Sequence, residues 1–279
     1  MPSTLTYSLL AALAGVVAVS AHGHVALVTI YGKSYQGFYP TSAPYGPQPP
    51  IVIWSNGATD NGFVLSSALQ DPDVICHLDA TNAALSAPVA TGGDVLVTWN
   101  QWANSHKSPV IDYLADCGTN CSSVDKTTLK WIKIAEMGEL QLGTRSGTPG
   151  KWADDLIIEN NLTWKGEAQL YPKCINLEIS GADTQSPDGV IGTQLYTVTD
   201  PGILHNIYND ESLSSVSDYK IPRPTLAAFN RSSSSGNGSS SGVATSMSAA
   251  SSIASTSTIT QPAVSSSATT KPKNYLQRS

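Results

Sequence analysis

Charged residues are scarce in this sequence of 279 residues, and basic residues are scarcer than acidic ones. Asp, Glu, Lys and Arg make up 13% of the chain, and 15 Lys and Arg against 21 Asp and Glu give a net charge of −6 at pH 7. A protein that binds nucleic acid needs a basic surface to neutralise phosphates. The deficit therefore excludes a nucleic-acid partner from our expectations, and the abundant Gly, Pro, Ser and Thr favour a secreted all-β protein.

Long hydrophobic runs are absent after the first twenty residues. Residues 9–19, LLAALAGVVAV, form an apolar run that is too short to span a bilayer as a helix. Val19, Ser20 and Ala21 at its end form the small-residue pattern that signal peptidase cleaves. We therefore predict a signal peptide over residues 1–21, an extracellular, secreted mature protein that begins at His22, and no association with a membrane.

Cysteine is limited to four residues, Cys76, Cys117, Cys121 and Cys174. An even number in a secreted chain indicates two disulfides, and three pairings are possible. A bond between Cys117 and Cys121 would close a small loop around Gly-Thr-Asn and leave Cys76 to pair with Cys174. The alternative, a zinc site, is disfavoured because the sequence contains no Cys-x-x-Cys pair.

Ser and Thr make up more than half of residues 231–270, where few apolar residues could form a core. This composition predicts a disordered, O-glycosylated tail over residues 229–279 without a carbohydrate-binding module. The folded domain is expected over residues 22–228. Asn161 and Asn230 lie in Asn-x-Ser/Thr sequences and are predicted N-glycosylation sites.

Five runs rich in Val, Ile, Thr, Tyr and Trp, each bounded by Gly, Pro, Asn or Asp, predict β-strands. The segment 33–50 is rich in proline and is predicted to be a loop. Short strands with this spacing indicate an all-β, immunoglobulin- or fibronectin-like antiparallel β-sandwich with long loops. The predicted strands cover residues 24–32, 93–102, 129–137, 170–180 and 191–199.

The predicted new terminus could bind a metal. Cleavage after Ala21 would give His22 a free α-amine beside its imidazole, and a third nitrogen from His106 would complete a set that prefers copper. A local alternative uses His24, because a chain that starts X-X-His can wrap copper with its amine, two backbone amides and that third ring. The alternative needs a flexible terminus, whereas residues 24–32 are predicted to form a strand.

Several longer motifs occur in one order through residues 22–225. In this order they make the chain similar to the fungal lytic polysaccharide monooxygenases of auxiliary-activity family 9, formerly glycoside hydrolase family 61. The resemblance implies one copper ion and oxidative cleavage of cellulose or a related β-1,4-glucan at C1, C4 or both, with O2 or H2O2 and an external electron donor. We expect a monomer. The motifs are HGHV (22–25), WNQWANSHKSPVIDYLADC (99–117), VDKTTLKWIKI (124–134), WADDLI (152–157), AQLYPKCINLEI (168–179) and YTVTDPGILHNIY (196–208).

The resemblance assigns roles to the residues that match the family's motifs. His22 and His106 match its two copper-binding histidines. Tyr171 matches the axial tyrosine beneath the metal, and Gln169 matches the glutamine that hydrogen-bonds oxygen species near the copper. Three neutral nitrogens suit both oxidation states of copper, and a polar surrounding shell orients the reactive species.

The resemblance also implies the pairing Cys76–Cys174 and Cys117–Cys121. Because the insoluble substrate is flat, we expect a flat binding face on which loop tyrosines stack against sugar rings. The candidates for stacking are Tyr35, Tyr39, Tyr45, Tyr208 and Tyr219.

One family segment is missing after Trp164. The family carries there a strand with an Arg-His-Glu triplet and then a histidine near the copper, whereas here Lys165, Gly166 and Glu167 follow directly. We expect a sandwich that lacks this strand and leaves the neighbouring strands unpaired, with slower oxygen activation. A mis-spliced or mis-predicted transcript is one explanation, and a weakened natural variant is the other.

Two other functions stay open. A non-catalytic copper-binding cell-wall protein would keep the metal without the reaction. His77, expected to be exposed beside Cys76, and His205, expected in a loop or edge strand, are assigned no role. A glycoside hydrolase would need two carboxylates that face one cleft, and its candidates are Asp154, Asp155, Glu159 and Glu167.

Overall fold

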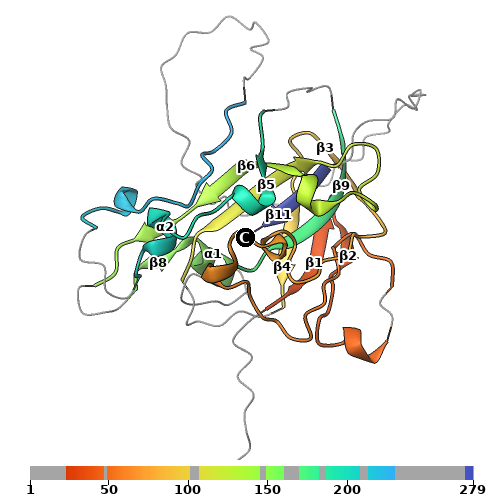
Figure 1. Ribbon diagram of the computed structural model, residues 1–279, viewed down its shortest axis with the longest axis horizontal. Coiled ribbons are helices and arrows are strands. Elements are labelled where there is room, and N and C mark those ends of the chain that lie inside the picture. Colours follow the sequence, from red (N-terminus) through yellow and green to blue (C-terminus); the bar gives the residue numbers. More distant parts are fainter. Residues whose placement is uncertain are drawn as a thin grey trace, which may run out of the picture.

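The computed structural model describes residues 23–46, 49–100, 107–144, 149–159, 170–181, 187–207, 213–229 and 274–278. Within them short strands dominate and helices are few (Figure 1). The α-helices are α1 (Ala153–Glu159) and α2 (Pro201–Leu204), and 3-10 helices occur at Ala43–Tyr45, Ser66–Ala68, Pro72–Val74, Lys126–Thr128, Gly192–Gln194 and Val216–Asp218. The strands are β1 (Val25–Ile30), β2 (Lys33–Gln36), β3 (Ala87–Ala90), β4 (Leu96–Trp99), β5 (Val110–Asp116), β6 (Lys130–Met137), β7 (Glu139–Gln141), β8 (Lys151–Trp152), β9 (Lys173–Ser180), β10 (Val190–Ile191) and β11 (Asn274–Arg278).

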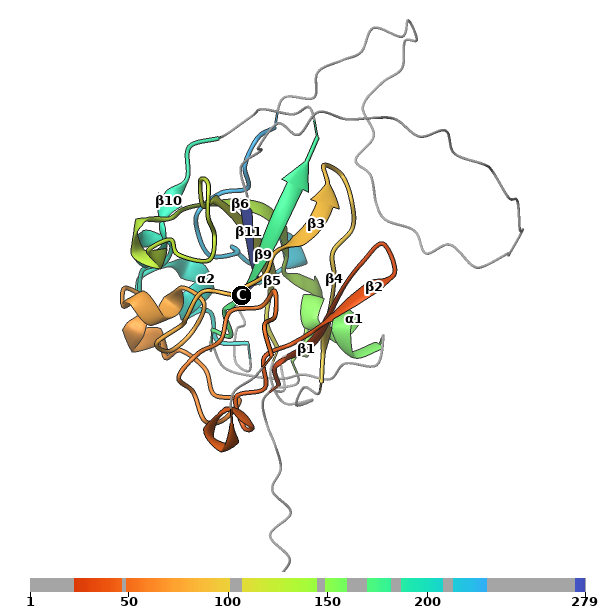
Figure 2. The same ribbon diagram turned by 90° about the vertical axis from the view of Figure 1, so that its right-hand side faces the viewer.

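The strands form two main sheets (Figure 2). The smaller sheet has the order β2–β1–β4, and the larger sheet has the order β10–β6–β5–β11–β9–β3. A separate antiparallel pair joins β7 to β8. The main-sheet pairs are antiparallel, except that β3 runs parallel to β9. This architecture confirms the predicted all-β sandwich, with one parallel pair that the prediction did not contain.

Two groups of buried side chains flank the larger sheet. The first contains Val28 of β1, Val97 of β4 and Ile175 of β9, so it lies between the two sheets. The second contains Tyr113 of β5 and Trp131 of β6 together with apolar residues from the loops between β2 and β3. The larger sheet is therefore buried on both faces, which is the principal source of hydrophobic stabilisation.

Strand β9 lies at the centre of this arrangement, and all of its residues from Lys173 to Leu177 are buried. The side-chain Oδ1 of Asn176 accepts a hydrogen bond from Trp54 Nε1 at 2.7 Å, and its Nδ2 donates to the Ala83 carbonyl at 3.0 Å. The backbone of β9 bonds to the same loop, because Trp54 N donates to the Cys174 carbonyl at 3.0 Å. These bonds fix the strand to the loops that cover the outer face of the sheet.

Both disulfides of the implied pairing are present. Cys76 is bonded to Cys174 and Cys117 to Cys121, so no cysteine of the described residues is free. The alternative of a zinc site built from cysteines is therefore wrong. The first bond attaches β9 to the loop before β3, and the second follows directly after β5.

Four of the five predicted strands are confirmed, and their observed forms are β1, β4, β6 and β9. The strand predicted at 191–199 is wrong, because β10 ends at Ile191 and a 3-10 helix follows. At Gly192 the backbone packs directly against Ile75 and leaves no room for a Cβ atom. The chain turns at this close contact instead of continuing along the sheet.

The loop predicted at 33–50 is wrong in its first four residues, which form β2. Strands β1 and β2 make a hairpin in which Ile30 is paired with Lys33. The two residues between them, Tyr31 and Gly32, have φ values of 49° and 76°. Positive φ at both central positions is the geometry of a type I′ turn, which matches the twist of the flanking strands.

The absence of the family strand after Trp164 was expected to leave its neighbours unpaired, but β5 and β9 each pair with another strand. Residues 274–278 form β11 and lie between β5 and β9 (Figure 1). This segment belongs to the predicted disordered tail 229–279, so the expectation of disorder is wrong for these five residues. Residues 230–273 lie outside the described residues, so the remainder of the tail and the domain boundaries stay predictions.

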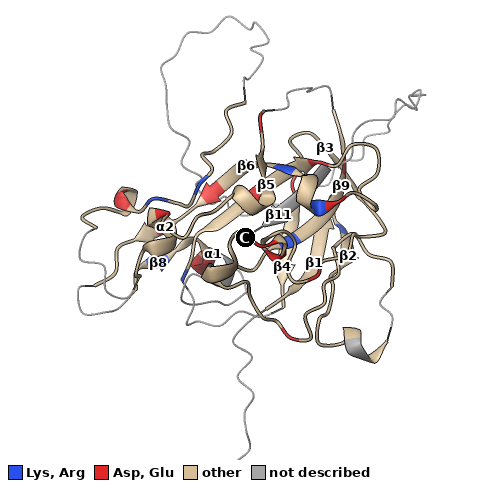
Figure 3. Cartoon of the chain, in the orientation of Figure 1, with Lys and Arg blue, Asp and Glu red and all other residues tan. Residues whose placement is uncertain are grey.

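Acidic and basic segments are scattered among uncharged ones over the described chain (Figure 3). Two ion pairs are formed among the described residues, Lys107 with Asp155 and Lys133 with Glu136. In the described part of the chain, no helix combines the length and apolar character needed to cross a membrane.

We predict that Asn176→Leu lowers the free energy of unfolding by about 2–4 kcal/mol, because it leaves the Trp54 indole N–H and the Ala83 carbonyl buried without these partners. Chemical denaturation measures this loss. Gln36→Leu, on exposed β2, is the matched control and should change stability by less than about 0.5 kcal/mol. Equal losses in the two variants would contradict the role given to Asn176.

Candidate functional site

The start of β1 and the end of β4 are joined by two hydrogen bonds. Asn100 N donates to the His24 carbonyl at 3.0 Å, and His24 N donates to Asn100 Oδ1 at 2.8 Å. Residues 22 and 101–106 lie outside the described residues, so the structure does not place His22 or His106. His22 is two residues from His24 and His106 six residues from Asn100, so chain length permits both to reach this point, at about 3.5 Å per residue at most.

His24 is buried and its ring is held on two sides. Its Nδ1 lies 2.9 Å from Asn61 Oδ1, and the ring packs edge-on against Tyr39 with 4.6 Å between centroids. Burial lowers the pKa of His24; the hydrogen bond to Asn61 opposes this shift, and the charge of Lys173 adds to it. The ring is therefore neutral, and its Nε2 has no hydrogen-bond partner among the described residues.

These contacts exclude the local X-X-His copper alternative in this conformation. That arrangement needs the His24 amide deprotonated and its Nδ1 bound to the metal. Here the amide donates to Asn100 and Nδ1 contacts Asn61. A metal at the terminus therefore cannot use the His24 amide and Nδ1 while these contacts are kept.

Tyr171 is buried between the sheets, two residues before the start of β9. Its ring lies 6.0 Å from that of Phe63, and both belong to the apolar group that includes Val25. Burial raises the pKa of the Tyr171 phenol beyond the range in which it could ionise in water. The side chain is therefore a neutral phenol.

The segment 61–64 connects Tyr171 to the start of β1. Asn61 contacts the His24 ring, and Phe63 packs on Tyr171. Val64 exchanges two backbone hydrogen bonds with Leu170, of 2.8 and 3.2 Å. This short segment therefore holds the predicted axial tyrosine near the end of the sandwich from which residue 22 extends.

A buried polar layer lies beneath this segment. His77 Nε2 donates to the Gly62 carbonyl at 2.9 Å, and its Nδ1 accepts from Leu78 N at 2.7 Å. Burial lowers the pKa of His77 to about 4, and the charge of Lys173 adds to this shift. Burial also lowers the pKa of Lys173 to about 8, against the opposing effect of Asp60. The expectation that His77 is exposed is wrong, since it is 4% exposed.

Lys107, which directly follows His106, is fixed to α1. Its Nζ forms an ion pair with Asp155 Oδ1, and Asp155 Oδ2 accepts a hydrogen bond from Trp152 N at 2.7 Å. Both side chains are largely shielded from solvent. The backbone that leaves the predicted ligand His106 is thus attached to the first turn of the helix.

The tyrosines predicted to stack on sugar lie in different environments. Tyr219 is buried against Trp152, so its prediction as a surface residue is wrong. Tyr35 and Tyr39 are half-buried, and Lys33 Nζ lies 4.8 Å from the centre of the Tyr35 ring. Tyr45 is 90% exposed, in the loop that begins beside His24.

Several predicted residues fall outside the described ranges. The structure does not place the ligands His22 and His106, the hydrogen-bonding Gln169, the stacking candidate Tyr208, or the glycosylation sites Asn161 and Asn230. Their roles stay predictions.

Asp154 and Asp155, the two hydrolase candidates whose side chains the structure describes, do not form a pair that faces a cleft. Asp154 is fully buried, and burial raises its pKa to about 8. Asp155 is engaged with Lys107 and the Trp152 amide. The side chains of Glu159 and Glu167 lie outside the described residues.

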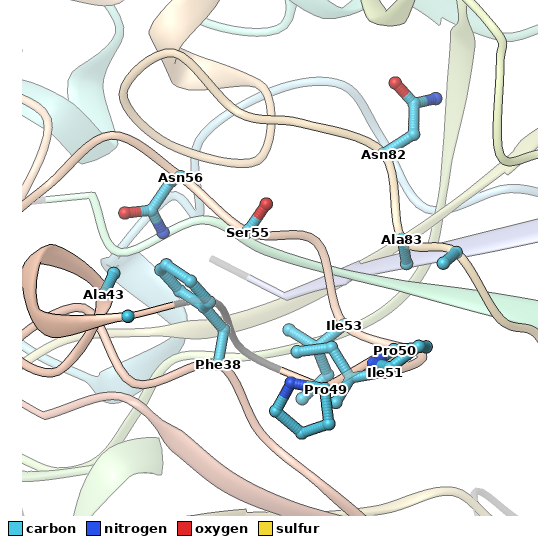
Figure 4. A pocket seen from close by; sticks show the side chains of 12 residues that line it. Phe38, Ala43, Pro49, Pro50, Ile51, Ile53, Ser55, Asn56, Asn82 and Ala83 are labelled. Carbon is cyan, nitrogen blue, oxygen red and sulfur yellow. The ribbon is translucent and has the colours of Figure 1, made fainter.

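A hollow of about 460 Å³ opens between the loops that follow β2 and precede β3 (Figure 4). Phe38, Pro49 and Ile51 supply apolar walls, and Ser55, Asn56 and Asn82 supply polar groups. Its lining contains neither Tyr171 nor His24. The hollow is therefore separate from the end of the sandwich where the predicted ligands attach.

A family model matches the chain over residues 22–167 and again over 163–219. That model is Auxiliary Activity family 9, formerly GH61. The chain belongs to this family. The two matched segments meet at 163–167, where the missing family strand is expected, and the first begins at His22.

Relatives and solved structures agree with this membership. The lytic polysaccharide monooxygenase A of Talaromyces verruculosus is 44% identical over 81% of this chain and 75% of its own length. The enzyme of the same name from Talaromyces pinophilus is 45% identical over 75% of each chain. The extended catalytic domain of LPMO9A from H. jecorina has a TM-score of 0.64 and 36% identity, covering 78% of this chain and 96% of its own.

Family membership makes the chain an oxidoreductase of the lytic polysaccharide monooxygenase class. The enzymes of this family are copper-dependent and cleave polysaccharides oxidatively with an external reductant, and the fungal members are secreted.

The structure adds residues that the sequence did not single out. Asn61, Phe63 and Asn100 hold His24 and Tyr171 in place, and His77 and Lys173 form the polar layer. They lie far apart in the sequence and follow no spacing rule. The sequence offered one signal for His77: it follows Cys76, and cysteine is among the residue types most often buried.

We predict that acid destabilises the protein through His77. The unfolded chain binds a proton near pH 6.5 and the folded chain only near pH 4, so stability falls as the pH drops through this window, by about 3 kcal/mol. Denaturation curves at pH 7 and pH 4 measure the difference in the free energy of unfolding between the two pH values. This difference should be smaller in His77→Gln than in the parent, and unchanged in the control His205→Gln.

An identical pH dependence of stability in His77→Gln and the parent would contradict the prediction.

We predict that Asp155→Asn weakens copper binding about threefold to tenfold, because Lys107 loses its ionic partner and the chain after His106 is held less firmly. Isothermal titration with Cu(II) measures the affinity. Asp188→Asn, at an exposed position, should leave it unchanged. An unchanged affinity in Asp155→Asn would show that the ion pair does not position this segment.

Proposed function

We propose that the chain is a secreted, monomeric copper monooxygenase that cleaves cellulose or a related β-1,4-glucan at C1, C4 or both, using O2 or H2O2 and an external reductant. The observation that carries the proposal is the family match from His22, the residue that removal of 1–21 would expose. Secretion through this signal peptide and glycosylation at Asn161 and Asn230 belong to the same proposal.

In this proposal, copper is bound by the α-amine and ring of His22 and by the ring of His106. Support comes from the described backbone, because His24 and Asn100 join the two segments that carry these ligands. The competing donors of His24 are already engaged. Bound copper would supply one-electron redox chemistry at a site with an open coordination position.

Tyr171 would lie beneath the metal as a neutral phenol. Its burial keeps the proton on the oxygen, so it adds no negative charge to the three neutral nitrogens. Packing against Phe63 restricts the ring, and the pairing of Leu170 with Val64 restricts its backbone. Gln169, two residues earlier, would supply a hydrogen-bond donor beside the copper site.

The substrate face would include the loop that begins at Tyr39. Tyr45 is the best exposed of the described candidates for stacking on a sugar ring, while Tyr39 packs against His24 and Tyr35 lies beside Lys33. Tyr35, Tyr39 and Tyr208 are thus proposed as supporting contacts and Tyr45 as the principal one.

A non-catalytic copper-binding cell-wall protein is the second candidate. The break in the family match at 163–167 favours it, because the missing strand carries in the family a histidine near the copper. Such a protein would bind copper with the same residues but would not cleave glucan chains.

The test uses secreted protein whose first residue has been verified by mass spectrometry. Loaded with one equivalent of copper and given ascorbate, it should release C1- or C4-oxidised oligosaccharides from swollen cellulose and show the electron paramagnetic resonance of a three-nitrogen copper site. His106→Ala should lower copper affinity by roughly a hundredfold or more and abolish the oxidised products. His205→Gln, outside the ligand set, should retain both.

Other results would decide against the proposal. Tight copper binding without oxidised products or H2O2 production would favour the non-catalytic candidate. Unmodified oligosaccharides released without reductant would favour a hydrolase. A first residue other than His22, combined with retained activity, would contradict the ligand assignment.

A further inference from the structure

The larger sheet contains a strand that is distant in sequence from its neighbours. Strand β11 pairs antiparallel with β5 on one edge and with β9 on the other (Figure 1). Both pairings cover the same five residues, from Asn274 to Arg278. Residues 230–273 separate this strand from the rest of the described chain.

We propose that β5 and β9 form the two walls of a strand-binding slot and that residues 274–278 of the same chain occupy it. The Ser/Thr-rich segment 230–273 is then a tether that delivers an essential strand to the folded domain. The slot recognises an extended peptide through its backbone, as in other proteins that accept an added strand.

The spacing of the strands shows why the slot needs an occupant. Neighbouring strands lie about 4.8 Å apart, so β5 and β9 are roughly 10 Å apart across β11. This distance is too large for direct hydrogen bonds between them. An empty slot would leave several backbone N–H and C=O groups of each wall without partners, and those of β9 lie in a buried strand.

The other edges of both walls are already used. Over residues 174–176 the second edge of β9 bonds to the loop at Val52 and Trp54, where Asn176 N donates to the Val52 carbonyl at 2.8 Å. The second edge of β5 is paired with β6. Neither strand can satisfy its inner edge by exchanging neighbours, so the slot is specific to an added strand.

A disulfide lies in or beside each wall. Cys174 of β9 is bonded to Cys76, and Cys117, directly after β5, is bonded to Cys121. The first bond anchors the β9 wall to a distant loop, and the second closes the short loop that leaves β5; both restrict the walls before the strand arrives, which reduces the entropy lost on binding.

The register places each residue of β11 between one residue of β5 and one of β9. Leu276 is paired with Leu114 and Ile175, and Tyr275 is paired with Ala115 and Asn176. Leu276 thus has an apolar residue as its register partner on each wall. Tyr is among the residue types enriched in strands.

The same chain is the favoured occupant because of the tether. The segment 230–273, if fully extended, would reach about 150 Å, which exceeds what is needed to return to the domain. A tethered strand binds at an effective concentration on the order of millimolar, far above that of a second copy in dilute solution. Exchange between two copies is therefore an alternative outcome of the test.

Hydrogen exchange of the full secreted chain tests the proposal without relying on its activity. The amides of Tyr275, Leu276 and Gln277 should exchange about tenfold or more slowly than those of the serines in 230–273, because they are bonded in the sheet. Exchange at the same rate as those serines would overturn the proposal. Dependence of the protection on protein concentration, with a dimer on gel filtration, would assign the slot to a second copy instead.

A variant tests the consequence for the walls. Leu276→Pro removes a backbone donor from the middle of the strand and should raise exchange at Leu114 and Ile175 and lower the Tm by about 5 °C or more. The matched control Ser266→Pro should change neither the exchange at these wall residues nor the Tm.

A peptide of residues 272–279 added in excess should restore the protection of the wall amides in Leu276→Pro. Equal behaviour of the two proline variants would overturn the proposal, and if Leu276→Pro fails to fold, the exchange of the parent chain still decides.

Discussion

The pairing of β9 on both of its edges is the constraint on which the rest of the structure depends. Residues 173–177 are buried on both faces of the larger sheet, so water cannot replace any partner that their backbone lacks. One edge bonds to the loop at Val52 and Trp54, and the other bonds to β11. The same five residues carry the disulfide to Cys76 and the Asn176 hydrogen bonds, and Tyr171 lies two residues before them. A shift of β9 would therefore move the core, the disulfide and the predicted axial tyrosine together.

The site at the end of the sandwich is built on this frame. The loop residues Asn61 and Phe63 contact His24 and Tyr171, which brings the start of β1 close to the start of β9. Burial keeps both side chains neutral, and it also favours the neutral forms of His77 and Lys173 beneath them. Neutral side chains at His24 and Tyr171 add no negative charge beside the predicted copper ligands. The family of copper monooxygenases to which the chain belongs uses such a site to oxidise polysaccharides.

Local patterns predicted the parts of the fold that depend on local chemistry. The alternating runs at 24–32 and 129–137 became β1 and β6 because one face of each meets the core, whereas 191–199 failed because the close packing of Gly192 on Ile75 is a tertiary contact. The family motifs identified Tyr171 and the cysteine pairing, but contacts such as Asn61 with His24 and His77 with Gly62 join residues that no spacing connects. Strand β11 could not be predicted, because five residues beyond a Ser/Thr-rich segment take their conformation from the slot that they enter.

The integrity of the catalytic domain thus depends on strand β11, a segment far from the family motifs. This strand also explains how a chain whose family match breaks at 163–167 keeps a continuous larger sheet. A crystal structure of the secreted, copper-loaded protein is the most direct test. The account predicts residues 274–278 antiparallel between β5 and β9, with copper bound by residues 22 and 106 above Tyr171. Direct pairing of β5 with β9, or another segment between them, would contradict it.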